Sequence, residues 1–192
     1  MSADHVRYSL LGPVRAWRGN VELPLGWPKQ RAVLAMLLLN ANRLVTRDAI
    51  VDGVWGEEAP ASAVNLVHTY IAGLRRVLEP GRPPRGTSRR LEQASSGYVL
   101  RLEAGQLDLD EFYVLLDRAR ASRASGDLAG VVRASTSALN LWEPPPLAGI
   151  PGPVAGIERT RLAELRLTTV ENRAEHCSTS ADTTNSLASC WL

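Results

Sequence analysis

The sequence predicts an α+β domain at the N-terminus, followed by an all-α region. Three observations lead to this fold class. Short β-like runs come first, segments with helical periodicity come next, and a hairpin pattern ends near residue 102. Beyond that point only helical periodicity recurs. With 192 residues and 45% hydrophobic content, the chain can bury a substantial core in one or two domains.

A small antiparallel sheet is expected first. The β-like runs are separated by Gly12-Pro13 and by Arg18-Gly19-Asn20, which are turn-forming sequences. The runs cover Val6 to Leu11, Val14 to Trp17 and Val21 to Leu25. Pro28 then opens a helix that reaches Asn42, because a proline at the first helical position gives up an N–H that would lack a partner anyway.

Two further helices follow. Thr46 is suited to cap a helix that has Asp48 in its first turn and ends at Gly56. A third helix is predicted from about Ser62 to Glu79, where Pro80-Gly81 ends it. Its expected buried stripe recurs at steps of three and four residues and contains Val64, Val67, Ile71, Leu74 and Leu78.

Positive charge gathers where the chain leaves this third helix. The formal net charge is only +2, but residues 61–90 contain six arginines and a single acidic residue, Glu79. Four of the arginines follow the helix within about ten residues: Arg82, Arg85, Arg89 and Arg90. Such local charge is typical of a surface that docks a polyanion.

A hairpin completes the first domain. Leu91 to Ala94 and Tyr98 to Leu102 are strand-like, and Ser95-Ser96-Gly97 forms the turn, in which Gly97 is expected to take a positive φ. A sheet, three helices and a hairpin in this order make a winged helix-turn-helix. In that arrangement the third helix enters the major groove of DNA, and the hairpin turn lies on the adjacent backbone or minor groove.

Several sequence blocks resemble a known family. Three blocks resemble the OmpR-type winged-helix domain: RLVTRDAIVDGVWG, NLVHTYIAGLRRVLEP and SSGYVLRL. Three more blocks make the chain similar, more specifically, to the Streptomyces antibiotic regulatory protein family: VRYSLLGPVRAW, PKQRAVLAMLLL and LDLDEFYVLLDRAR. The resemblance covers about residues 6–175. It implies an activator of an antibiotic biosynthetic gene cluster that binds direct repeats of promoter DNA as a pair of protomers. It also implies recruitment of the RNA polymerase holoenzyme through its sigma factor.

The third helix carries the expected base contacts. Positions 65, 66, 69, 70 and 73 lie off the apolar stripe, toward the N-terminal half of the helix. Asn65 can pair with adenine, and Thr69 or Tyr70 can contact a thymine methyl group or a phosphate. Leu66 lies on the same face, while Arg75 and Arg76 are interpreted as phosphate contacts. His68 is expected to be a packed or solvent-facing side chain.

Other contacts are expected around this helix. Thr46 and Arg47 can hold a phosphate at a helix N-terminus, and Lys29 and Arg31 can do the same. Members of the family commonly carry arginine at the positions of Gly73 and Ala94, and both are missing here. In the wing, the candidates for DNA contact are therefore Arg90, Gln93, Ser95 and Ser96.

The helical region is expected to be short. We predict domains at residues 1–103 and 104–176, with a disordered polar tail at 177–192. The second resembles the bacterial transcriptional activator domain, with tetratricopeptide-like helix pairs. Helical stripes contain Leu109, Phe112, Tyr113, Leu116 and Ala119, then Leu128, Val131, Val132, Ser135, Leu139 and Trp142, then Ile157, Leu162, Leu165 and Val170. The sequence fits either a naturally short domain or a truncated one. In both cases no following helix pair would cover the apolar face formed by Leu139, Trp142, Leu162 and Leu165.

Other classes of protein are less well supported. Asp108, Asp110 and Glu111 are interpreted as a helix first turn, and we predict no enzyme, no cofactor and no metal site. The alternatives to an activator are a helical protein-interaction adaptor and a truncated DNA binder that cannot activate. No apolar run approaches the roughly 18 residues of a membrane span, and residues 1–9 lack a signal-peptide core. We therefore expect a cytoplasmic, nucleoid-associated protein without a membrane partner.

Overall fold

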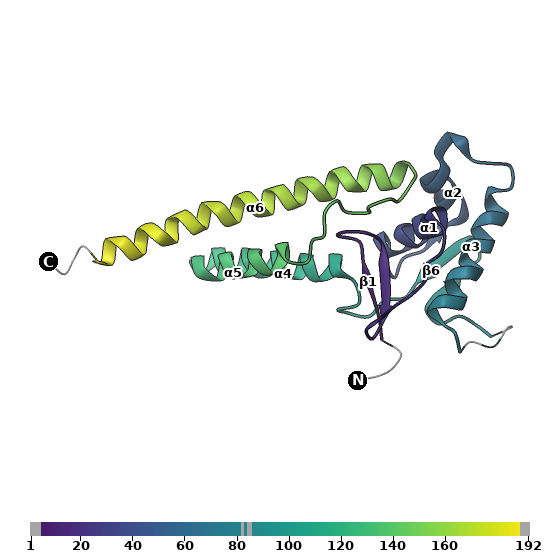
Figure 1. The fold of residues 1–192 in the computed structure, drawn as a ribbon, viewed down its shortest axis with the longest axis horizontal. Coiled ribbons are helices and arrows are strands. Elements are labelled where there is room, and N and C mark those ends of the chain that lie inside the picture. Colours follow the sequence, from purple (N-terminus) through teal and green to yellow (C-terminus); the bar gives the residue numbers. More distant parts are fainter. Residues whose placement is uncertain (1–4, 82, 84–85, 189–192) are drawn as a thin grey trace.

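The computed structural model describes residues 5–81, 83 and 86–188. Figure 1 shows a mixed head at one end and a helical arm that points away from it. The head contains β1 (Val6–Ser9), β2 (Arg15–Arg18), β3 (Val21–Glu22), α1 (Pro28–Leu39), β4 (Val45–Thr46), α2 (Arg47–Trp55), a 3-10 turn η1 (Gly56–Glu58), α3 (Ala63–Leu78), β5 (Leu91–Gln93) and β6 (Gly97–Leu100). The arm contains α4 (Asp108–Ala124), α5 (Leu128–Leu139) and α6 (Pro153–Ala188). The predicted fold class is confirmed.

Two small antiparallel sheets flank the helices of the head. The first has the order β1-β2-β3, as the N-terminal runs predict. The second has the order β4-β6-β5, so the short strand before α2 pairs with the wing hairpin. Strand β4 was not predicted. It fixes the wing to the start of α2, because Thr46 lies opposite Gly97 in the strand register.

The core of the head surrounds α1. All residues from Ala32 to Leu38 are buried, so α1 is the central helix rather than an amphipathic surface helix. Helix α2 begins as predicted, with the Thr46 Oγ1 accepting a hydrogen bond from the Ala49 N–H at 3.2 Å. It ends at Gly56, whose φ is 59°.

Helix α3 buries most of the predicted stripe. Val67, Ile71, Leu74 and Leu78 are buried, but Val64 is 41% exposed. The residue that faces inward at this end is Ala63, the first residue of the helix, which stands four positions before Val67 on the same buried face. The expectation for Val64 was therefore wrong.

The arm is attached to the head through a continuous core. Phe112 of α4 and Trp142 pack edge to face with ring centroids 5.2 Å apart, and both belong to the core cluster that contains Leu10 and Leu11. Helix α5 ends at Leu139, so Trp142 lies in the connection that follows rather than in the predicted helix. Trp142 and Leu162 are buried against the head, which corrects the expectation of an uncovered apolar face there.

Helix α6 differs from the sequence expectation at both ends. Ile157 was predicted to point inward but is 67% exposed, and the buried residues of this first part are Ala155 and Leu162. The helix continues to Ala188, through most of the segment expected to be a disordered tail. No proline or glycine occurs between residues 157 and 188 that would end it.

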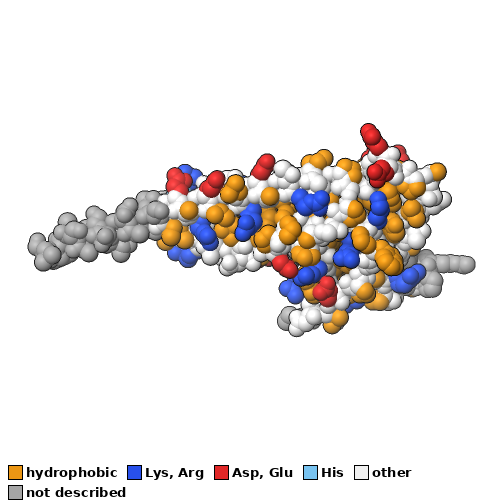
Figure 2. All heavy atoms as spheres, turned by 45° about the horizontal axis from the view of Figure 1, so that its top comes forward, with side chains coloured by type: hydrophobic (Ala, Val, Ile, Leu, Met, Phe, Trp, Pro, Cys, Tyr) orange, Lys and Arg blue, Asp and Glu red, His pale blue; other side chains and the backbone are white. Residues whose placement is uncertain are grey.

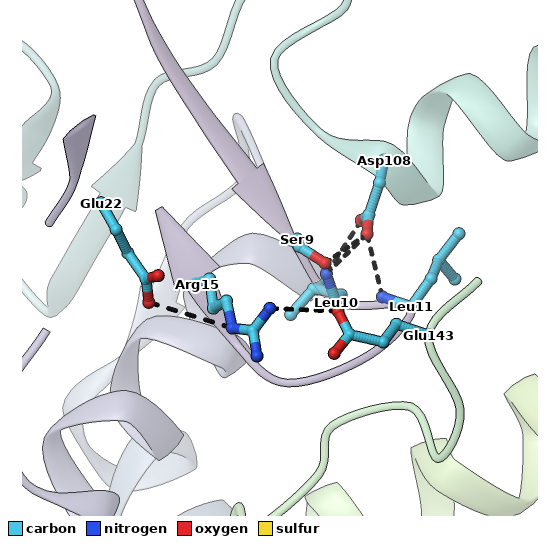
Figure 3. Close-up of polar contacts among 7 residues, drawn as sticks. All are labelled: Ser9, Leu10, Leu11, Arg15, Glu22, Asp108 and Glu143. Carbon is cyan, nitrogen blue, oxygen red and sulfur yellow. Dashed lines mark hydrogen bonds and ion pairs between the residues drawn. The ribbon is translucent and has the colours of Figure 1, made fainter. Parts of the chain in front are cut away.

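Polar contacts tie the arm to the first sheet. The Asp108 carboxylate accepts hydrogen bonds from the Ser9 hydroxyl and from the backbone N–H groups of Leu10 and Leu11 (Figure 3). Burial raises the pKa of the Asp108 carboxyl above its ordinary value, while these hydrogen bonds oppose the rise. Arg15 forms an ion pair with Glu143 at 3.1 Å. The head and arm are thereby held in one relative orientation.

Candidate nucleic-acid interface

The exposed side of α3 carries mostly polar residues, with Val64 as an exposed apolar residue at its N-terminal end. Asn65, Thr69 and Arg76 are exposed along it, opposite the buried stripe. The Thr69 hydroxyl donates to the Asn65 backbone carbonyl at 3.0 Å, so neither the Thr69 methyl group nor the Asn65 side-chain amide takes part in this bond. The amide can form a bidentate contact with adenine, and the methyl can contact thymine.

Two of the predicted contacts on α3 are partly buried. Leu66 and Tyr70 pack against the core of the head. The Tyr70 ring stacks on the Trp55 ring, with centroids 6.3 Å apart and planes 10° from parallel. The Lys29 ammonium lies 5.0 Å from the centroid of the same Trp55 ring. Tyr70 and Lys29 thus join the ends of α1 and α2 to α3 through the Trp55 ring.

Arg75 and Arg76 have different environments. Arg76 is exposed, whereas Arg75 donates from Nε to the Leu91 carbonyl at 2.9 Å and lies 5.8 Å from the Tyr98 ring centroid. The Tyr98 hydroxyl is 2.7 Å from His68 Nδ1 on α3. Burial raises the pKa of Tyr98, and the positive charge of Arg75 and Arg47 opposes that rise. These contacts join α3 to the wing strands.

The wing turn meets the N-terminus of α2. The Arg47 backbone N–H donates to the Ser96 carbonyl at 3.0 Å, and its guanidinium donates to the Ser95 carbonyl at 2.9 Å. Thr46, Arg47, Ser95 and Ser96 therefore lie together, although the sequence suggested them as two separate sites. Both serines are exposed. A β-branched pair at Val45-Thr46 was the available signal for the strand that brings them together.

Gly97 is required by close packing rather than by its dihedral angle. A Cβ at this position would lie 1.9 Å from the Val45 carbonyl oxygen and 2.7 Å from the Thr46 Cα. Gly97 is not among the glycines with positive φ, so that expectation was wrong. The missing side chain lets β6 lie directly against β4.

The remaining candidates lie at the edges of this surface. Gln93 is exposed at the end of β5, and Arg31 donates from Nε to the Gly26 carbonyl at 3.1 Å near the start of α1. Glu79 accepts hydrogen bonds from the backbone N–H groups of Arg89 and Arg90 at 2.8 and 3.0 Å. Glu79, which follows α3, therefore holds the backbone of the basic loop at Arg89 and Arg90. Arg82 and Arg85 lie outside the described residues.

Gly73 also has a structural explanation. A Cβ at Gly73 would lie 2.9 Å from Oε1 of Gln30 on α1, and the Gln30 amide donates to the Leu25 carbonyl at 3.0 Å. In this chain the space beside Gly73 on α3 is therefore occupied by the Gln30 side chain.

Within the described part of the chain, no group of three or more His, Cys, Asp or Glu side chains is arranged to hold a metal ion. The described helices include none that is long and apolar enough to cross a membrane.

Two families of known proteins match successive parts of the chain. Residues 22–100 match the family "Transcriptional regulatory protein, C terminal", and residues 107–189 match the family "Bacterial transcriptional activator domain". The regulatory protein AfsR of Streptomyces coelicolor is 43% identical over 171 residues, which cover 88% of this chain and 16% of AfsR. The chain belongs to the Streptomyces antibiotic regulatory protein family. The matched relatives are transcriptional regulators and not enzymes.

Other relatives extend the comparison within the family. The regulatory protein DnrI of Streptomyces peucetius is 29% identical, over 88% of this chain and 64% of DnrI. A solved structure of Mycobacterium tuberculosis EmbR, in complex with a low-affinity phosphopeptide, superposes with a TM-score of 0.84 and 30% identity. That match covers 97% of this chain and 50% of the EmbR chain. The chain thus spans a small part of AfsR and about half of EmbR.

Proposed function

We propose that this protein is a sequence-specific transcriptional activator that binds direct repeats in promoter DNA of an antibiotic biosynthetic gene cluster. The observation that supports this most is the exposed face of α3, where Asn65, Thr69 and Arg76 lie beside a wing that Arg75 and Arg47 hold in place. Leu66, Tyr70, Lys29, Arg31, Thr46, Ser95, Ser96, Arg90 and Gln93 form or support the edges of the proposed DNA surface.

The arm supports the activating part of the proposal. It points away from α3, so it stays accessible when α3 lies in a major groove (Figure 1). We propose that it contacts the RNA polymerase holoenzyme, including its sigma factor, or a second protomer on the adjacent repeat. A regulator of this kind acts on the bacterial nucleoid, in the cytoplasm.

Salt-dependent binding tests the DNA-binding part. The 192-residue chain should shift a promoter fragment with two direct repeats in a gel, and the logarithm of its binding constant should fall linearly with the logarithm of salt concentration. A scrambled fragment of equal length should bind at least about a thousandfold more weakly. Equal affinity for both fragments would show that binding is not sequence-specific. The absence of a shift at low salt would favour the alternative that the protein is a protein-interaction adaptor.

Activation needs its own measurement. Transcription from the same promoter with purified RNA polymerase should rise when the protein is added, and it should fall to the basal level when the repeats are scrambled. A protein that binds the repeats without raising transcription would be a DNA binder that lacks the activating function.

A further inference from the structure

The arm contains a cavity of about 120 Å³ between α4, α5 and α6. Helix α5 packs against both of the other helices. Helix α4 begins beside Ser9 of the first sheet, and Figure 1 shows α6 running away from the head, so α4 and α6 point in the same direction. The described side chains that line the cavity all come from these three helices. The cavity is therefore a feature of the arm itself.

One side-chain contact sets the alignment of α4 and α6 along their length. Arg161 of α6 donates from Nη1 to the Tyr113 hydroxyl of α4 at 2.8 Å. Leu116 and Leu165 each lie about one turn beyond this contact, so they line the end of the cavity nearer the head. His176 lies about four turns beyond it, so it lines the far end. The cavity thus has an apolar end and a polar end.

The polar end carries donors and positive charge. His176 is only 8% exposed, and its Nε2 has no hydrogen-bond partner among the described residues. Arg120 and Arg123 of α4 line the cavity with exposed side chains. Arg120 already pairs with Asp117, whereas Arg123 pairs with no carboxylate in the described part of the chain. The described lining contains no Asp or Glu, so this end favours a negatively charged group.

The apolar end limits the size and the chemistry of a ligand. Leu116 and Val131 are buried there, and Leu165 is half-buried. A cavity of about 150 Å³ with an apolar lining binds benzene, so a cavity of 120 Å³ accommodates about four or five carbon atoms. An inorganic anion would make no apolar contact at this end. A fully apolar molecule would leave the buried His176 Nε2 without a partner, which costs free energy.

We propose that this cavity binds a short aliphatic carboxylate. Its hydrocarbon part lies against Leu116 and Leu165, and its carboxylate accepts hydrogen bonds from Arg123 and from His176, whose proton is then on Nε2. Figure 2 shows basic side chains among hydrophobic ones along the surface of the arm. A bound acid contacts all three helices and therefore stabilises the arm. The inference goes beyond the proposed function and does not depend on it.

Isothermal titration calorimetry of the 192-residue chain tests the ligand class. The probe is 3-methylbutanoate, which should bind at one site with a Kd of about 1 mM or lower. Its neutral analogue 3-methylbutanamide and inorganic phosphate should each bind at least about tenfold more weakly, because the first lacks the charge and the second lacks the apolar part. Absence of saturable binding of 3-methylbutanoate would overturn the proposal. Equal or tighter binding of either comparison compound would also overturn it.

Two substitutions on α4 test the carboxylate contact. Arg123→Gln should raise the Kd for 3-methylbutanoate at least about fivefold and leave the weak binding of the amide unchanged. Arg118→Gln is the matched control, because Arg118 is exposed on the same helix but does not line the cavity. It should leave both dissociation constants unchanged. Equal effects of the two substitutions would overturn the role of Arg123.

A substitution on α6 tests the buried end. His176→Phe removes the buried nitrogen while keeping a ring, so it should abolish binding of 3-methylbutanoate and leave the thermal midpoint equal or higher. Undiminished binding by this variant would overturn the placement of the ligand. Arg123→Gln and His176→Phe should both still shift the promoter fragment in a gel, so loss of the acid is distinguishable from loss of DNA binding.

Discussion

Asp108, the first residue of α4, accepts a hydrogen bond of 2.7 Å from the Ser9 hydroxyl, which lies 99 positions earlier in the sequence. The same carboxylate accepts the backbone N–H groups of Leu10 and Leu11 (Figure 3). An acidic first turn is ordinarily explained by the helix dipole alone. Here the side chain has a second role, because it joins the arm to the edge of the first sheet.

Removing this carboxylate should destabilise the whole chain. Asp108→Ala leaves part-buried donors without an acceptor, and we expect the free energy of unfolding to fall by about 3 kcal/mol. Urea denaturation followed by tryptophan fluorescence measures this change. Glu111→Ala is the control, since Glu111 is exposed in the same first turn and should change stability by less than about 1 kcal/mol. Equal effects of the two substitutions would show that the contact with Ser9 adds nothing.

Much of the fold follows from periodicity and turn residues. The Thr46 cap, the Gly56 terminus and the hairpin from Leu91 were predictable because each depends on neighbours in the sequence. The contact of Asp108 with Ser9 was not, because it depends on two segments that meet only in the folded chain. Strand β4 was missed for the same reason, since two residues form a strand only when β6 lies beside them.

The candidate site shows the same limit. The stripe on α3 predicted which side of the helix is exposed, and Asn65 and Thr69 are exposed as expected. Periodicity could not show that Arg75 points to the Leu91 carbonyl or that Tyr70 stacks on Trp55, because these partners come from other elements. The predicted burial of Val64 and Ile157 was also wrong, since both lie near the N-terminal ends of their helices, where contacts with neighbouring elements rather than periodicity decide burial.

Arg75 and Arg76 should have separable effects. Arg76→Ala should weaken binding to all DNA sequences and flatten the slope of log K against log salt by about one unit, as expected for one lost phosphate contact. Arg75→Ala should instead lower the thermal midpoint and reduce binding to the specific site, because the wing loses its link to α3. Fluorescence anisotropy at several salt concentrations measures both. An unchanged slope for Arg76→Ala would show that Arg76 does not contact a phosphate.

Asn65 and Thr69 should determine base preference. Asn65→Ala and Thr69→Ala should each change the preferred bases by about 1 to 3 kcal/mol while leaving non-specific affinity nearly intact. Ala72→Ser, on the same exposed face one turn further along, serves as the control. Selection from a randomised DNA library measures the preference. The same preferred sequence in the wild type and both alanine variants would place these residues outside the base contacts.

Gly97→Ala tests whether the wing must lie directly on β4. The added methyl group would overlap the Val45 carbonyl, so β4 and β6 must separate. We expect a loss of unfolding free energy of about 2 kcal/mol or more, together with weaker DNA binding. Gly81→Ala is the matched control, because a Cβ there meets no atom within 4 Å. Similar stability of the two variants would show that the strands tolerate the change.

Tyr8 should make the protein unstable at high pH. Its hydroxyl is buried without a hydrogen-bond partner among the described residues, and burial raises the pKa of Tyr8 to about 12. The unfolded chain, with a tyrosine pKa of about 10, loses this proton first, so stability should fall as pH rises from about 10 to 12, by about 2 to 3 kcal/mol. Tyr8→Phe should remove this component and leave stability near pH 8 equal or higher. Urea denaturation of both proteins at pH 8 and pH 11 measures the difference, and an identical loss of stability in the two would exclude Tyr8 as its source.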